Sequence, residues 1–169
     1  KRKLETLVDG EVGIYVCGIT PYSPSHIGHA RQAIAFDIIV RWLRNSGYKV
    51  NHITNFTDID DKIIAIANDE KVHFLEVANR NIEDYFDVMN LLNVLPADAY
   101  PRVTETIPEI ISMISRLISS GNAYESSDGV YFEINSAPEK YGQLTGQTLE
   151  MVQEGAGGRV NTTGSGKKN

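Results

Sequence analysis

Two short apolar segments, joined by a loop and a long amphipathic segment, constrain the fold of this chain most strongly. Residues 12–17 are apolar and partly β-branched, as expected of a buried strand. Prolines and small polar residues make 18–25 a loop. Residues 28–46 then predict a helix, and 48–53 a second strand. This order predicts a βαβ unit in a parallel sheet with a right-handed crossover.

Apolar residues recur at helical spacing along the predicted helix. Ile34, Ile38 and Trp42 form one stripe, with Ile39 and Leu43 beside it. We expect this stripe to face the core. The arginines of the helix are then expected to face away from it: Arg31, Arg41 and Arg44.

The rest of the chain is predicted to be mainly helical, with one hairpin. Apolar residues at helical spacing predict helices over 58–69, 74–92 and 108–120. Segments 123–126 and 130–134 flank a Ser-Asp-Gly sequence, which predicts a short hairpin.

The composition argues against several classes of protein. No apolar run approaches the roughly 20 residues that a membrane-spanning helix needs, and the basic N-terminus is not followed by the apolar segment of a signal peptide. A single cysteine allows no intrachain disulfide, so a cytoplasmic location is expected. A formal net charge of -6 argues against a globally basic nucleic-acid binder.

Two histidines, His26 and His29, lie where the loop meets the predicted helix. A helix N-terminus favours negative charge, and Gly28 between the histidines allows a ligand to approach closely. The pattern suits a triphosphate whose phosphoryl oxygens accept hydrogen bonds from the imidazoles. The structural alternative is that His26 caps the helix and His29 packs in the core.

Cys17 ends the first predicted strand, where side chains of a parallel sheet point toward a ligand crevice. A cysteine in this place serves as a metal ligand, as a nucleophile or as a small apolar filler, and the filler is the commonest use. One cysteine cannot form a tetrahedral metal site, and its spacing to the histidines matches no standard zinc signature.

Three aspartates, Asp58, Asp60 and Asp61, follow the second predicted strand. Thr57 and Asp60 resemble a capping box that opens the next helix, and acidic residues favour a helix N-terminus. The functional alternatives are that the carboxylates hold an ammonium group in the same crevice, or that they bind magnesium. The residues alone leave these interpretations open.

Together these segments resemble the class I aminoacyl-tRNA synthetases, whose signature His-Ile-Gly-His stands letter for letter at 26–29. The finer resemblance is to the cysteinyl-tRNA synthetases. Tyr-Val-Cys-Gly-Ile-Thr at 15–20 is similar to that family's Tyr-Val-Cys-Gly-x-Thr. Asn-Phe-Thr-Asp-Ile-Asp-Asp-Lys-Ile-Ile at 55–64 is similar to its Asn-Ile-Thr-Asp-Ile-Asp-Asp-Lys-Ile-Ile. Weaker likeness continues at 101–104 and 141–144.

The resemblance implies a Rossmann-type α/β fold and the reaction of a cysteine–tRNA ligase. Such an enzyme activates cysteine with ATP and Mg²⁺ to cysteinyl-adenylate and transfers it to tRNA(Cys). The resemblance implies that His26, Gly28 and His29 bind ATP and that both histidines are catalytic.

The resemblance also implies a site for the amino acid. Gly18, Thr20 and Thr57 would hold its backbone groups. Cys17 would be one of four ligands of a Zn²⁺ ion, with the others beyond residue 169. A zinc-bound thiolate would then distinguish cysteine from serine.

The implied organisation has three parts. Residues 1–100 would form the first half of a Rossmann catalytic domain, 101–155 a helical and hairpin connective insertion, and 156–169 a flexible glycine-rich tail at a truncation point. tRNA would mainly contact regions outside this sequence, so the isolated segment is expected to be inactive. Thr106 stands where the family usually has a histidine.

Two other functions share some of these features. One is the cysteine ligase of mycothiol biosynthesis, which joins cysteine to an amino sugar and shares the zinc site. The other is a noncatalytic nucleotide-binding module.

Overall fold

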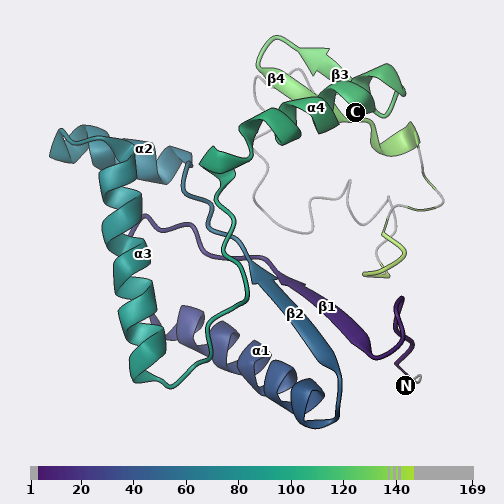
Figure 1. The fold of residues 1–169 in the computed structure, drawn as a ribbon. Coiled ribbons are helices and arrows are strands. Elements are labelled where there is room, and N and C mark those ends of the chain that lie inside the picture. The colour runs from purple at the N-terminus through teal and green to yellow at the C-terminus, as the bar shows by residue number, and fades with distance from the viewer. Residues whose placement is uncertain (1–3, 137, 139, 141, 147–169) are drawn as a thin grey trace. The chain divides into compact units, whose positions relative to one another are not determined.

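The predicted βαβ unit is present near the start of the chain (Figure 1). β1 (Glu11–Val16) and β2 (Lys49–Thr54) pair in parallel, and α1 (Ile27–Asn45) connects them. Val16 lies opposite Thr54 at the carboxyl end of both strands. The computed structural model describes residues 4–136, 138, 140 and 142–146, and its parallel sheet with flanking helices confirms the α/β class.

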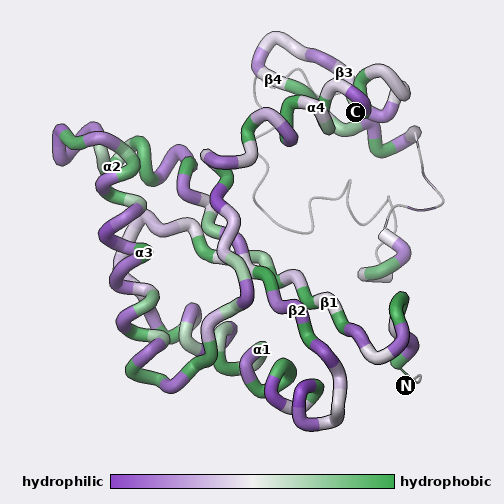
Figure 2. Tube along the Cα trace, viewed as in Figure 1, coloured by the Kyte–Doolittle hydropathy of each residue, from purple (hydrophilic) through white to green (hydrophobic). Residues whose placement is uncertain are grey.

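The prediction that the apolar stripe of α1 faces the core is wrong. Ile38 and Trp42 are 61% and 70% exposed. The buried residues of the helix are instead Ala30, Asp37 and Val40. A two-stranded sheet covers only a narrow strip of a helix, and small side chains let the helix approach it closely. In Figure 2 hydrophobic and hydrophilic residues alternate along α1, so hydropathy alone does not mark its buried side.

The arginines expected to face away from the core are exposed, and two of them also form ion pairs. Arg41 pairs with the buried Asp37 at 2.8 Å and donates to the carbonyl oxygen of Asn93 at 2.8 Å. Arg44 pairs with Asp98 at 3.1 Å. A buried carboxylate is tolerated in α1 because a charged partner and hydrogen bonds compensate its desolvation.

α2 (Asp61–Glu70) and α3 (Phe74–Leu91) pack against each other through the buried side chains of Ile63, Ala67, Val77 and Ala78. α2 begins three residues later than predicted. Its N-cap is Asp60 and not Thr57, and the Asp60 carboxylate accepts from the backbone N–H of Lys62 at 2.9 Å. The predicted capping at Thr57 is therefore wrong.

After α3 the chain returns alongside β2. Parallel bridges join Ile53 to Ala99 and Phe56 to Arg102, and the 3-10 turn η1 (Val103–Glu105) follows. Phe56 is buried in a cluster of aliphatic and aromatic side chains: Ile19, Ile82, Tyr85 and Tyr100. This cluster holds the loops that follow β1 and β2 against α3.

The chain divides into two compact units, residues 1–106 and 107–169. The second unit contains a helix, the predicted hairpin and a 3-10 turn: α4 (Ile107–Ser119), β3 (Ala123–Ser126), β4 (Gly129–Phe132) and η2 (Ile134–Ser136). The predicted tail, 156–169, lies outside the described residues. Within the part that the structure describes, no helix has the length and apolar character needed to cross a membrane.

Candidate functional site

His26 and His29 stand together at the N-terminus of α1. Their rings stack, with centroids 3.8 Å apart and planes inclined by 22°. Nδ1 of His26 accepts from the backbone N–H of Gly28 at 3.1 Å, and Nδ1 of His29 accepts from the N–H of His26 at 3.4 Å. His26 is therefore the N-cap of α1, and both histidines form its capping box.

These hydrogen bonds determine which ring nitrogen carries a proton. A neutral imidazole has one donor and one acceptor nitrogen, so an accepting Nδ1 places the proton on Nε2. Burial lowers the pKa of His29 from 6.5, and the nearby His26 lowers this pKa further. The lowered pKa favours the neutral form of His29, in which Nε2–H is the donor. The ring donors and the free N–H groups of the helix end suit phosphoryl oxygens.

Gly28 leaves the space that the ring of His26 occupies. A Cβ atom at Gly28 would lie 2.8 Å from Cε1 and 2.9 Å from Nδ1 of His26. Any larger residue would push this ring out of its capping position. The glycine of the motif is therefore required for the ring arrangement itself.

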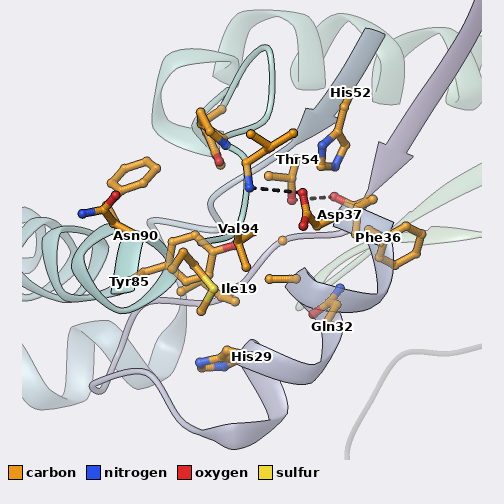
Figure 3. Close-up of a pocket in the computed structure, with 18 of the residues that line it drawn as sticks. Ile19, His29, Gln32, Phe36, Asp37, His52, Thr54, Tyr85, Asn90 and Val94 are labelled. Atoms are coloured by element: carbon orange, nitrogen blue, oxygen red, sulfur yellow. Dashed lines mark hydrogen bonds between the residues drawn. The ribbon is translucent and has the colours of Figure 1, made fainter. Parts of the chain in front are cut away.

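A cavity of about 240 Å³ lies beside this helix end (Figure 3). Its walls come from the carboxyl end of β1, from α1 and α3, and from the segment that follows α3. Figure 3 shows His29 and Gln32 on α1, and Tyr85 and Asn90 on α3, around it. Most of its lining is apolar, with polar groups at a few points, as is usual for a small-molecule pocket.

Cys17 directly follows β1, and its side chain is exposed. Cys17, Gly18 and His29 border the same cavity, whereas His26 is not among the described residues that line it. The side-chain amide of Gln32 donates to the carbonyl oxygen of Cys17 at 2.8 Å. This bond holds α1 to the end of β1 beside the thiol.

The loop after β2 closes on the loop after β1. The N–H of Gly18 donates to Oδ1 of Asn55 at 2.9 Å, and the N–H of Thr57 donates to the carbonyl oxygen of Ile19 at 3.0 Å. A Cβ atom at Gly18 would lie 1.5 Å from the carbonyl oxygen of Asn55, so no side chain fits there. The structure thus brings Gly18 and Thr57 together, and Thr20 lies partly exposed in the first loop.

Two of the three aspartates bind groups of the chain itself. Asp58 is fully buried, and its carboxylate accepts from the backbone N–H and the hydroxyl of Thr104 at 3.0 and 2.6 Å. Asp60 caps α2. These contacts favour the structural interpretation of Asp58 and Asp60 over ammonium or magnesium binding.

Residues 3–169 match the family described as tRNA synthetases class I (C) catalytic domain. The chain belongs to this family. It is 50% identical over its whole length to the cysteine–tRNA ligase of Pyrococcus furiosus, and 51% identical over 91% of its length to that of Dehalococcoides mccartyi. These alignments cover 35% and 34% of the relatives, so the chain spans about a third of the length of the curated relatives it matches.

Solved structures of class I synthetases have a similar fold. Mycobacterium tuberculosis methionyl-tRNA synthetase in complex with methionyl-adenylate matches with a TM-score of 0.58 and 27% identity. The match covers 66% of this chain and 23% of that chain. Class I synthetases have Rossmann-type folds, so the Rossmann-type fold implied by the sequence motifs is confirmed.

The thiol of Cys17 has the chemistry that one ligand position of a zinc site would need. A thiolate is a soft ligand that suits zinc, and this thiol is exposed beside the cavity. Among the described residues, however, no group of three or more His, Cys, Asp or Glu side chains could hold a metal ion. Three further ligands are needed to complete a tetrahedral site.

Sequence reasoning missed the amides that position the site. The side chains of Gln32 and Asn55 bind the carbonyl oxygen and the N–H of the peptide group that joins Cys17 to Gly18. An uncharged amide has no spacing rule that signals such a role, although Asn55 opens one of the synthetase motifs. The α3 wall of the cavity, which includes Tyr85 and Met89, was also missed, because the apolar spacing in 74–92 indicates a helix but no pocket.

Proposed function

We propose that the protein to which this chain belongs is a cysteine–tRNA ligase. It activates cysteine with ATP and transfers the cysteinyl group from the adenylate to tRNA(Cys). The observation that carries this proposal is the similarity, at 44–51% identity over 91–100% of the chain, to proteins named cysteine–tRNA ligase. These names favour tRNA over the amino sugar of mycothiol biosynthesis, and an enzyme over a noncatalytic nucleotide-binding module.

In the activation step, a carboxylate oxygen of cysteine attacks the α-phosphorus of ATP, and pyrophosphate leaves. We assign the phosphate contacts to His26 and His29, whose Nε2–H groups are left free by their capping bonds. Hydrogen bonds from these groups strengthen as negative charge moves onto the leaving pyrophosphate. Gly28 supports this role because it makes room for the stacked rings. Mg²⁺ accompanies ATP as its counterion.

In the amino-acid site, we assign the backbone groups of cysteine to Gly18, Thr20 and Thr57. Support comes from the contact between the two loops that carry them. Cys17 holds one of four ligand positions of Zn²⁺, and the remaining three lie outside the described residues. Bound zinc would take the substrate thiol as a thiolate and so select cysteine over serine.

The proposed organisation follows from the same function. Residues 1–100 form the first half of the catalytic domain, and 101–155 form a connective insertion. Most tRNA contacts lie in parts of the protein outside this sequence. The proposed location is the cytoplasm, whose reducing conditions keep the thiol of Cys17 free.

The test is cysteine-dependent exchange of pyrophosphate into ATP by the intact protein. His26→Ala and His29→Ala should each slow exchange roughly 100-fold to 1,000-fold, as the loss of one donor to a transition state does elsewhere. His73→Ala is the matched control, because Nδ1 of His73 also caps a helix, accepting from the N–H of Leu75 at 3.3 Å. It should keep the wild-type exchange rate.

Absence of cysteine-dependent exchange in the wild-type protein would contradict the proposed function. Wild-type rates in both His26→Ala and His29→Ala would contradict the assignment of these residues to ATP while leaving the function itself intact.

A further inference from the structure

The side-chain amide of Asn55 joins three segments around the candidate site. Its Oδ1 accepts from the hydroxyl of Tyr15 at 2.9 Å and from the backbone N–H of Gly18 at 2.9 Å. Its Nδ2 donates to Oγ1 of Thr57 at 3.3 Å. A backbone N–H can only donate, so the amide oxygen must face Gly18 and the amide nitrogen must face Thr57.

The hydroxyl of Thr57 consequently keeps its own hydrogen for another partner. A hydroxyl has one hydrogen to donate and two lone pairs that accept. The bond from Asn55 occupies a lone pair and turns the hydroxyl hydrogen away from the amide. Within the part of the chain that the structure describes, this hydroxyl donates to no protein group, and the backbone N–H of Thr57 is already bound to Ile19. Thr57 therefore presents a hydrogen-bond donor, which suits a carboxylate.

The same amide fixes the backbone beside the thiol. The bond from the N–H of Gly18 to Asn55 holds the residue next to Cys17, and the missing side chain of Gly18 allows the two loops to touch. A single side chain thus sets the position of the Cys17 loop relative to the hydroxyl of Thr57.

We propose that Asn55 is a positioning residue for the amino-acid substrate, which it does not itself touch. It directs the hydroxyl of Thr57 at one carboxylate oxygen of the amino acid. It also fixes the distance between the Cys17 loop and this hydroxyl. This inference rests on the proposed function, because it takes Thr57 to bind the amino acid. An amide with only a structural role would change stability, whereas a positioning amide also changes the KM for the amino acid, and it does so through Thr57.

Asn55→Asp tests this role with almost no change in shape. The aspartate still accepts from Gly18 and Tyr15 but has no N–H group for Thr57. In cysteine-dependent ATP–pyrophosphate exchange by the intact protein, the KM for cysteine should rise roughly tenfold, and the KM for ATP should stay within about twofold, as the loss of one hydrogen bond predicts.

Asn122→Asp is the matched control. Nδ2 of Asn122 likewise donates to a hydroxyl, that of Ser120 at 2.7 Å, in the second compact unit. The control should leave the KM for cysteine unchanged.

A double-mutant cycle with Thr57→Val separates positioning from simple charge repulsion. If Asn55 acts through the Thr57 hydroxyl, Asn55→Asp has no further effect on the KM for cysteine in the Thr57→Val protein. An equal effect in both backgrounds would mean that the new carboxylate repels the substrate directly, and it would overturn the proposal. Should Asn55→Asp fail to fold by circular dichroism, Asn55→Ser replaces it in the same cycle.

The outcomes separate this inference from the function on which it rests. Wild-type protein without cysteine-dependent exchange would refute the proposed function. Wild-type protein that exchanges normally, together with an unchanged KM for cysteine in Asn55→Asp, would refute the positioning role alone.

Discussion

Replacing Gly18 with alanine tests how tightly the two loops of the site pack. A Cβ atom at Gly18 would lie 1.5 Å from the carbonyl oxygen and 2.6 Å from the carbonyl carbon of Asn55. Ordinary van der Waals contact begins at 3.4 Å. The loops would therefore have to separate by about 2 Å to accept one methyl group.

A separation of this size breaks the hydrogen bonds between the loops. The bond from Gly18 to Asn55 measures 2.9 Å, and the bond from Thr57 to Ile19 measures 3.0 Å. Both would exceed hydrogen-bond length. Two lost bonds at about 1 kcal/mol each, with about 1–3 kcal/mol for overpacking, lower the free energy of unfolding by about 3–5 kcal/mol.

Urea denaturation followed by circular dichroism measures this loss, with Gly13→Ala as the control. Gly13 lies in β1, and nothing stands within 4 Å of the Cβ atom that alanine would add. Its free energy of unfolding should change by no more than about 0.5 kcal/mol. Equal stability of the Gly18→Ala and Gly13→Ala proteins would refute the close approach of the two loops.

Four further predictions concern the histidines, the thiol, the buried carboxylate and the isolated chain. An NMR titration should give a pKa below 6.5 for His29, and His26→Gln should raise this pKa without restoring 6.5, because burial remains its larger cause. The contribution of His29 to stability is then fully present above about pH 6.5 and is lost as the pH falls through the lowered pKa. A contribution from His29 that grows on acidification would contradict the lowered pKa. Cys17→Ala and Cys17→Ser should both reduce the zinc content of the intact protein, measured by atomic emission, and leave its affinity for ATP unchanged. Full zinc content in either variant would exclude Cys17 as a ligand. Thr104→Val removes the hydroxyl that donates to Asp58 at 2.6 Å and should lower the free energy of unfolding in urea by about 2 kcal/mol. The isolated 169-residue chain should show neither ATP–pyrophosphate exchange nor tRNA charging, and robust activity would mean that the catalytic set is complete within it.

The order of elements in the first unit could be predicted from local sequence rules. Apolar runs, prolines and helical spacing placed β1, α1 and β2 to within one residue. Gly47 lies just beyond α1 with a φ of 91°, a conformation that glycine adopts without strain. Rules of this kind succeed because each depends on a few neighbouring residues.

The buried side of α1 could not be predicted in this way. The sequence offers both an apolar stripe, which includes Ile38 and Trp42, and a narrower strip, which includes Ala30 and Asp37. Periodicity favours the first. The second is buried because Asp37 finds partners in Arg41 and in a segment nearly sixty residues away along the chain. A charged residue argues against burial of the helix face that carries it, unless the group that compensates its desolvation is known.

The candidate site likewise has one part that local sequence predicts and another part that it does not. The sequence predicted that His26 and His29 lie at the start of α1, and it offered His26 as the helix cap, because capping involves residues within a single turn. The stacking of the two rings, and the partners of Gly18 and Asp58 at 37 and 46 positions away in the chain, are known only from the structure. The contacts of Gly18 and Asp58 depend on the parallel register of β1 and β2 and on the return of the chain beside β2, and no local pattern encodes the distance between two loops.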